Sequence, residues 1–123
     1  MTRLLFLFLS ILMLCSSGAA AIDAKHGGKV AQTSGHHFVE LVLKEGVINV
    51  HVLHDDGTAQ DVAGAKGMAV VLSGGNKEQI PLAPSGASVL SGSGDFKNAA
   101  GTVVVVTLTM SKHSPEQARF VLD

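Results

Sequence analysis

Beyond residue 35, short runs of β-branched and aliphatic residues alternate with turn-forming residues along the whole chain. The runs recur at intervals of about 8 to 12 residues, which is typical of an antiparallel sandwich or barrel. No stretch keeps its apolar residues at a helical period over several turns, as an amphipathic helix would. The pattern therefore predicts an all-β domain.

The clearest unit comprises residues 37–44 (HFVELVLK) and 47–54 (VINVHVLH), which flank Glu45 and Gly46. A two-residue loop that ends in glycine predicts a β-hairpin with a tight primed turn. In that register Lys44 faces Val47, and His37 faces His54.

Alternation along this hairpin separates two faces. The face that we expect to pack in the core holds Val39, Leu41, Leu43, Ile48, Val50 and Val52. Glu40, Asn49 and His51 share the opposite face, with Glu40 across from His51. His37 and His54 fall at the open end of the core face.

Further strands are expected at residues 29–32, 68–73, 76–82, 88–90, 101–110 and 116–122. Pro81 and Pro84 place the end of one of them at a sheet edge or at its exit. The run 101–110 (GTVVVVTLTM) is expected to be a central, well-buried strand. Six to eight short strands in one small domain predict an antiparallel immunoglobulin-like β-sandwich.

The N-terminal 21 residues have the three parts of a secretory signal. Arg3 supplies the positive charge, residues 4–14 (LLFLFLSILML) are apolar, and Ala19-Ala20-Ala21 provides a cleavage site. The alternative is an uncleaved anchor, but 11 apolar residues fall short of the roughly 20 that a spanning helix needs. We therefore expect a signal peptide at 1–21, a flexible lead-in at 22–35 and a β-sandwich domain at 36–123.

Cleavage after Ala21 changes the chemistry that the chain can offer. Cys15 leaves with the signal, so the mature chain has no cysteine for a disulfide or a thiolate ligand. Lipidation of Cys15 is not expected, because Leu14 stands where a lipoprotein signal needs a small residue. The expected location is the periplasm, with no stable membrane insertion after cleavage.

Charge and aromatic content exclude several kinds of partner. The mature chain keeps eight Lys and Arg against ten Asp and Glu, and it has no basic surplus to hold a phosphate backbone. Phe38, Phe96 and Phe120 are its only aromatic rings, whereas platforms for single-stranded nucleic acid rely on such rings. We therefore expect no nucleic-acid partner.

Catalytic motifs are missing. The serines lie in glycine-rich turns without a G-x-S-x-G elbow, and no G-x-x-x-x-G-K-[ST] phosphate loop is present. Most carboxylates flank turns, where solvated side chains are the ordinary finding. The sequence predicts that the protein is not an enzyme.

Histidine is the one enriched functional residue, and all six histidines belong to the mature chain. Directly opposed residues of a hairpin have Cβ atoms about 4.5–5.5 Å apart, so His37 and His54 could share one metal ion. His36 or Asp55 would add a third ligand, and His26 a fourth. Imidazole with a carboxylate suits Cu(II) and Zn(II). The alternative is that these histidines pack side by side or face solvent without metal.

Several short motifs also resemble a known kind of module. H-G-G from His26, then HHFVELV, EGVINVHV, D-D-G, VLSGG, an L-x-P-x-G segment, G-D-F and a final Q-A-R-F span about Lys25 to Phe120. Together they resemble a small periplasmic module associated with the adaptor (membrane-fusion) subunits of heavy-metal efflux pumps, and immunoglobulin-like domains of the FixH and YtkA sort.

The resemblance implies a periplasmic β-sandwich linked to metal efflux or delivery, with an efflux adaptor or another periplasmic protein as partner. The chain lacks the hairpin and barrel domains of a complete adaptor. We therefore expect a metal-binding or metal-relay module for copper or zinc. The alternative is a non-catalytic interaction domain that docks a partner protein by strand addition without metal.

Overall fold

The computed structural model describes residues 22–96 and 99–123, and this part of the chain is all-β. The expected signal peptide at 1–21 lies outside the described residues. Within the described ranges no helix has the length and apolar character to cross a membrane.

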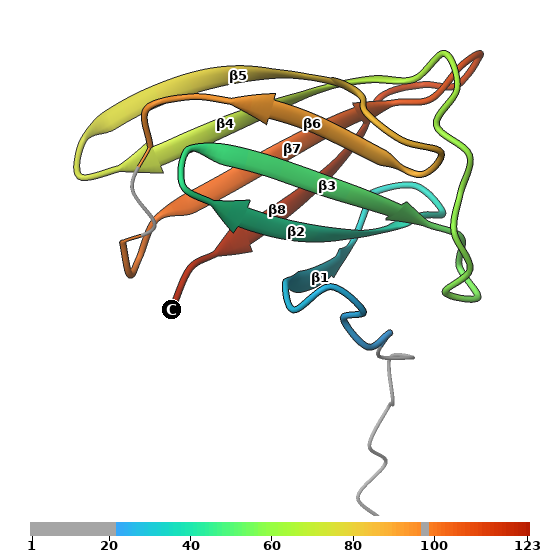
Figure 1. Ribbon diagram of the computed structural model, residues 1–123, viewed down its shortest axis with the longest axis horizontal. Helices are drawn as coiled ribbons and strands as arrows, with labels where there is room; N and C mark the ends of the chain where they lie inside the picture. The colour runs from blue at the N-terminus through green and yellow to red at the C-terminus, as the bar shows by residue number, and fades with distance from the viewer. Residues whose placement is uncertain (1–21, 97–98) are drawn as a thin grey trace, which may run out of the picture.

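Eight antiparallel strands form one sheet (Figure 1). The strands are β1 (Lys29–Gln32), β2 (Phe38–Lys44), β3 (Val47–Leu53), β4 (Lys66–Ser73), β5 (Asn76–Pro84), β6 (Val89–Ser93), β7 (Val103–Thr109) and β8 (Glu116–Val121). Their order in the sheet is β1-β2-β3-β6-β5-β4-β7-β8. The prediction of six to eight short antiparallel strands is thus confirmed.

The sheet bends at the pairing of β5 with β6 and rolls until its two outer strands meet. β5 and β6 share only two residue pairs, Ala83 with Ser91 and Pro84 with Leu90. Pro84 is the last residue of β5, which agrees with the expected strand end, because proline cannot extend a ladder of hydrogen bonds. At the far side, the Ser34 N–H donates to the Gln117 carbonyl over 2.9 Å.

This closure gives a barrel-like sheet, where the sequence led us to expect two separate sheets. Both arrangements enclose one core between two layers of strands, so the alternation of apolar and polar residues is the same for both. The contacts between β1 and β8 distinguish the barrel-like sheet from a sandwich. The sequence pattern does not reveal these contacts, because the two strands lie at opposite ends of the chain.

The register predicted for the hairpin is confirmed along its whole ladder. Lys44 pairs with Val47 and Glu40 with His51, and the ladder ends at Phe38 and Leu53. Glu45 and Gly46 both have positive φ, 34° and 81°, as a type I′ turn requires.

The core lies inside the rolled sheet. Five of the six hairpin residues predicted for the core are buried, and Leu43 packs against them partly buried. Buried side chains from the other strands complete it, and they include Ile80, Leu90, Val104, Val106, Leu108 and Phe120. Each fully buried aliphatic side chain of this kind stabilises the fold by about 1.5–3 kcal/mol.

The strand expected at residues 29–32, within the lead-in, is β1, and it pairs with β2. The expectation for residues 101–110 needs correction. β7 does lie between two strands, but it is buried on one face only. Its residues alternate between buried and half-buried, because successive side chains of a strand point to opposite faces and only one face of β7 lies on the core.

Candidate functional site

Four of the six histidines lie at one end of the sheet. Because the strands are antiparallel, the connections at residues 33–37, 54–65, 85–88 and 110–115 all fall at the end where β2 begins and β3 ends (Figure 1, right). His36, His37, His54 and His113 belong to three of these connections. We call this end of the molecule the histidine end.

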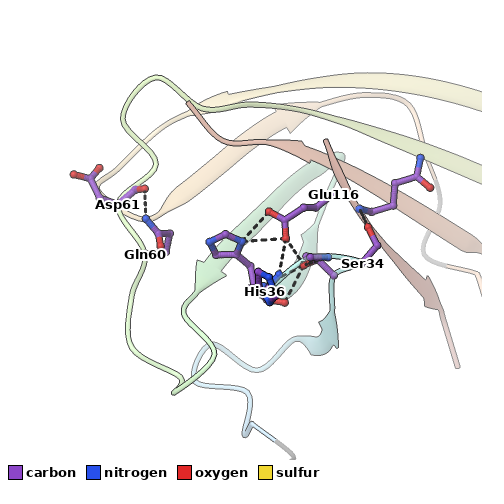
Figure 2. Close-up of polar contacts among 9 residues, drawn as sticks. Ser34, His36, Gln60, Asp61 and Glu116 are labelled. Carbon is purple, nitrogen blue, oxygen red and sulfur yellow. Dashed lines mark hydrogen bonds and ion pairs between the residues drawn. The ribbon is translucent and has the colours of Figure 1, made fainter. Parts of the chain in front are cut away.

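Glu116, at the start of β8, organises the turn between β1 and β2 (Figure 2). Its carboxylate accepts hydrogen bonds from the Thr33 hydroxyl (2.7 Å) and the His36 backbone N–H (3.0 Å). The closest imidazole contact is His37 Nδ1 to Glu116 Oε2, at 2.8 Å. The side chains of His37 and Glu116 are 18% and 10% exposed.

The environment of Glu116 determines which ring nitrogen of His37 carries the proton and which one can act as a ligand. Burial raises the pKa of the Glu116 carboxyl, but hydrogen bonds from Thr33 and His37 outweigh burial and leave that pKa below its ordinary value. An ionised carboxylate can only accept, so His37 Nδ1 carries the proton in this contact. When the ring is neutral, Nε2 keeps its lone pair and is the nitrogen available as a ligand.

A pocket of about 370 Å³ adjoins this contact. His36 and His37 line it from the turn between β1 and β2, and His113 lines it from the turn between β7 and β8. His36 and His113 are exposed. Three imidazoles and the Glu116 carboxylate therefore border one space.

His54 and Asp55 lie at the same end, in the turn that follows β3. The His54 N–H donates to the Thr58 carbonyl (2.7 Å), and its carbonyl accepts from the Gly57 N–H (3.0 Å). Both side chains are exposed. The paired ladder ends one residue before His54, so His37 turns toward Glu116 and His54 follows its own turn.

His26 lies elsewhere, on the outer face of β2 and β3. Its ring stacks on His51, with centroids 3.7 Å apart and planes 4° from parallel. Its Nδ1 lies 3.0 Å from Glu40 Oε1. Glu40, 1% exposed, also accepts from the backbone N–H groups of Lys25, His26 and Gly28. The turn at residues 25–28 thus closes over a buried carboxylate.

These contacts shift two pKa values on this face. Burial raises the pKa of Glu40, but the hydrogen bonds from Gly28, His26 and Lys25 leave it below its ordinary value. Burial lowers the pKa of His51, the charge of His26 lowers it further, and the charge of Glu40 opposes both.

The five residues predicted as metal ligands are not assembled as a group. Within residues 22–96 and 99–123, no three His, Cys, Asp or Glu side chains are placed so that they could hold a metal ion. His36, His37, His54 and Asp55 share one end of the molecule, whereas His26 contacts His51 and Glu40.

Two residues of the histidine end were missed from the sequence. Glu116 and His113 flank Ser114-Pro115, and neither is among the ligands expected from the sequence. In β8 buried and exposed residues alternate, and Glu116 takes the first of the buried positions. This alternation is the one feature of the sequence that indicates a buried carboxylate. Its proximity to His37, 79 residues away, has no local signal.

Fold and site together define an all-β antiparallel domain of one rolled sheet, with histidines gathered at one end. Comparison with family models, curated proteins and solved structures finds no match to this chain. The resemblance to periplasmic metal-efflux modules stays a prediction from the sequence motifs.

Proposed function

We propose that this protein is a periplasmic module that binds or relays a copper- or zinc-type metal ion in heavy-metal efflux or homeostasis. The observation that carries the proposal is the pocket at the histidine end, which His36, His37 and His113 line together. Imidazole is a ligand that both Cu(II) and Zn(II) accept.

The contact between Glu116 and His37 supports this proposal on chemical grounds. In metal sites, a ligating histidine commonly donates its second ring N–H to a carboxylate, which orients the ring and makes it a better ligand. His37 has that arrangement, with Nδ1 on Glu116 and Nε2 unused by the contact. We assign His37 the role of first ligand and Glu116 the role of its positioning residue.

The remaining ligands would come from exposed side chains. His36 and His113 line the pocket, and His54 lies in a neighbouring connection at the same end. Exposed side chains change rotamer on the picosecond to nanosecond timescale. Reorientation of these rings toward His37 therefore requires no change in the sheet.

Isothermal titration of Cu(II) and Zn(II) into the purified protein tests the proposal. We expect one site whose affinity falls at least about tenfold in His37→Ala, and about 10–100-fold in Glu116→Gln, because removal of a carboxylate partner weakens a site by that amount. His36→Ala and His113→Ala should each weaken binding as well. His51→Ala is the matched control, a histidine on the outer face, and it should leave the affinity unchanged. Equal small losses in all six histidine variants would contradict the proposal.

A second function is favoured by the junction of β1 and β8. A hollow of about 420 Å³ lies there, lined by Gly28, Leu41, Leu43 and Leu122 and by the ion-paired Lys29 and Asp123. An open junction between two edge strands is a place where an extended segment of a partner protein could add a strand. This alternative requires no metal, and titration without any heat of binding would favour it.

A further inference from the structure

The outward face of β4, β7 and β8 is apolar in its centre. Leu72, Val103 and Val121 are cross-strand partners in one row, and their chain neighbours Val71, Val104 and Phe120 point into the core. Partners in an antiparallel ladder project to the same side of the sheet. Leu72 is 39% exposed and Val121 51% exposed.

The next rows continue the same surface. Val70 pairs with Val105, and Met68 lies two residues further along β4, on the same side. All three are half-buried. We call the surface formed by Met68, Val70, Leu72, Val103, Val105 and Val121 the β4–β7–β8 face.

Cations surround this face. Lys77 lies across from Leu72 on β5, Arg119 lies across from Val105 on β8, and Lys66 is two residues before Met68 on β4. All three are exposed. On β4, β5, β7 and β8, which the structure describes in full, the two glutamates are Glu78 and Glu116, and alternation turns both inward. Along these four strands the outward side therefore bears positive charge alone, in a chain whose formal net charge is −1. Beyond the end of β8, the exposed Asp123 pairs with Lys29 of β1 over 2.9 Å.

We propose that the β4–β7–β8 face rests on the surface of an anionic membrane. Aliphatic side chains at the centre would enter the boundary between headgroups and acyl chains. The surrounding Lys and Arg would keep their charges at the phosphate level while their stems lie along the apolar surface. This is surface adsorption, distinct from insertion of a membrane-spanning segment.

The chemistry of the face favours this occupant over a second copy or a protein partner. Face-to-face pairing of two copies would bring Lys66, Lys77 and Arg119 of both copies together, and the outward sides of the four strands carry no carboxylate to pair with them. Protein interfaces are enriched in aromatic residues, and no aromatic side chain belongs to this face.

Vesicle sedimentation of the purified protein tests the proposal. Vesicles of phosphatidylglycerol are compared with vesicles of phosphatidylcholine, at low and at high salt. We expect binding to phosphatidylglycerol that falls with salt, and little binding to phosphatidylcholine. Leu72→Asp and the double variant Lys77→Glu/Arg119→Glu should each reduce binding at least about tenfold.

Matched controls come from the opposite half of the sheet. Val47→Asp replaces a valine on β3 that is 38% exposed, and Lys44→Glu reverses an exposed lysine on β2. Both controls should bind as the parent protein does. The double variant Lys77→Glu/Arg119→Glu alters exposed side chains only, so it keeps the test decisive if Leu72→Asp fails to fold.

Three outcomes would overturn the proposal. They are no binding to phosphatidylglycerol at low salt, equal losses in the face variants and their controls, and a dimer in sedimentation velocity that Leu72→Asp dissociates. The third outcome would assign the face to contacts between copies of this chain. The proposal is independent of metal binding, because none of its residues lines the pocket of His36, His37 and His113.

Discussion

Glu40 and Glu116 have the same role in two places. Each is a buried carboxylate in a strand, and each accepts from backbone N–H and from one imidazole of a turn near the N-terminus. Glu40 accepts from three backbone N–H groups, and Glu116 from one together with the Thr33 hydroxyl. A buried charge is costly unless hydrogen bonds satisfy it, and here every bond comes from a turn that the carboxylate holds in place. The two glutamates therefore fix the turns at residues 25–28 and 33–37 on the sheet.

Glu40→Gln should lower the free energy of unfolding by about 1–3 kcal/mol, because the amide cannot accept on both ends and leaves buried N–H groups unsatisfied. Denaturant unfolding measures the change. Glu45→Gln, at an exposed turn position, is the control and should stay within about 0.5 kcal/mol of the parent protein. Equal values for the two variants would contradict the role of Glu40.

The sequence placed Glu40 opposite His51, and the register confirms that placement. It did not indicate that Glu40 is buried. The turn that covers it begins 15 residues away, and no local pattern predicts that a covering turn will dock there. Alternation tells which side of a strand a residue is on, and only tertiary packing tells whether that side is covered.

Among the elements, the hairpin of β2 and β3 is the best determined. Its two turn residues both have positive φ, a conformation that glycine and asparagine adopt more readily than glutamate. Register and turn type follow from this local geometry, which is why both could be predicted.

Glu45→Asn should therefore raise the free energy of unfolding by about 0.5 kcal/mol, and Gly46→Ala should lower it by about 1–3 kcal/mol because alanine is strained at this φ. Thermal or denaturant unfolding of the two variants measures both changes. Opposite signs for these neighbouring positions are the expected result, and a shared sign would mean that the turn has another conformation in solution.

β7 shows where an element could not be predicted from its residues. The run of four valines suggested burial on both faces, yet one side forms part of the β4–β7–β8 face. A run of β-branched residues fits any strand, since β propensity mainly reports packing on a pleated surface. Which faces are covered depends on what the rest of the chain places over them.

At the scale of the whole molecule, the lowered pKa values predict how stability depends on pH. The folded state holds the pKa of His51 below its ordinary value of about 6.5, so the unfolded state takes up a proton first as pH falls. Stability from His51 is complete above pH 6.5 and is lost below it. For Glu40 and Glu116, also lowered, the contribution is present above about pH 4.3 and is lost as pH falls through the folded pKa values.

Unfolding free energies measured from pH 8 to 3 test the direction of these pKa shifts. The difference between the parent protein and His51→Gln should shrink below about pH 6.5, and the difference between the parent and Glu40→Gln should shrink below about pH 4.3. A difference that grows as pH falls in either range would contradict the assigned direction of the shift.

Local sequence alone determined the strands, the turns between them and the register of the first hairpin. Those features depend on residues within a few positions of one another, through side-chain alternation and the backbone angles that a turn requires. The expected strand at 29–32 agrees with the structure, and so do the hairpin partners from Phe38 with Leu53 to Lys44 with Val47, whereas the expected pair of His37 and His54 lies beyond the ladder.

Tertiary structure alone decided how the sheet closes, which carboxylates are buried and which histidines meet. His37 meets Glu116 across 79 residues, and His26 meets Glu40 across 14, through contacts that no local pattern encodes. The physical reason is that the first contact forms only when the sheet rolls its two edges together, and the second only when the turn at residues 25–28 docks on β2. The location of each histidine is therefore a property of the closed fold.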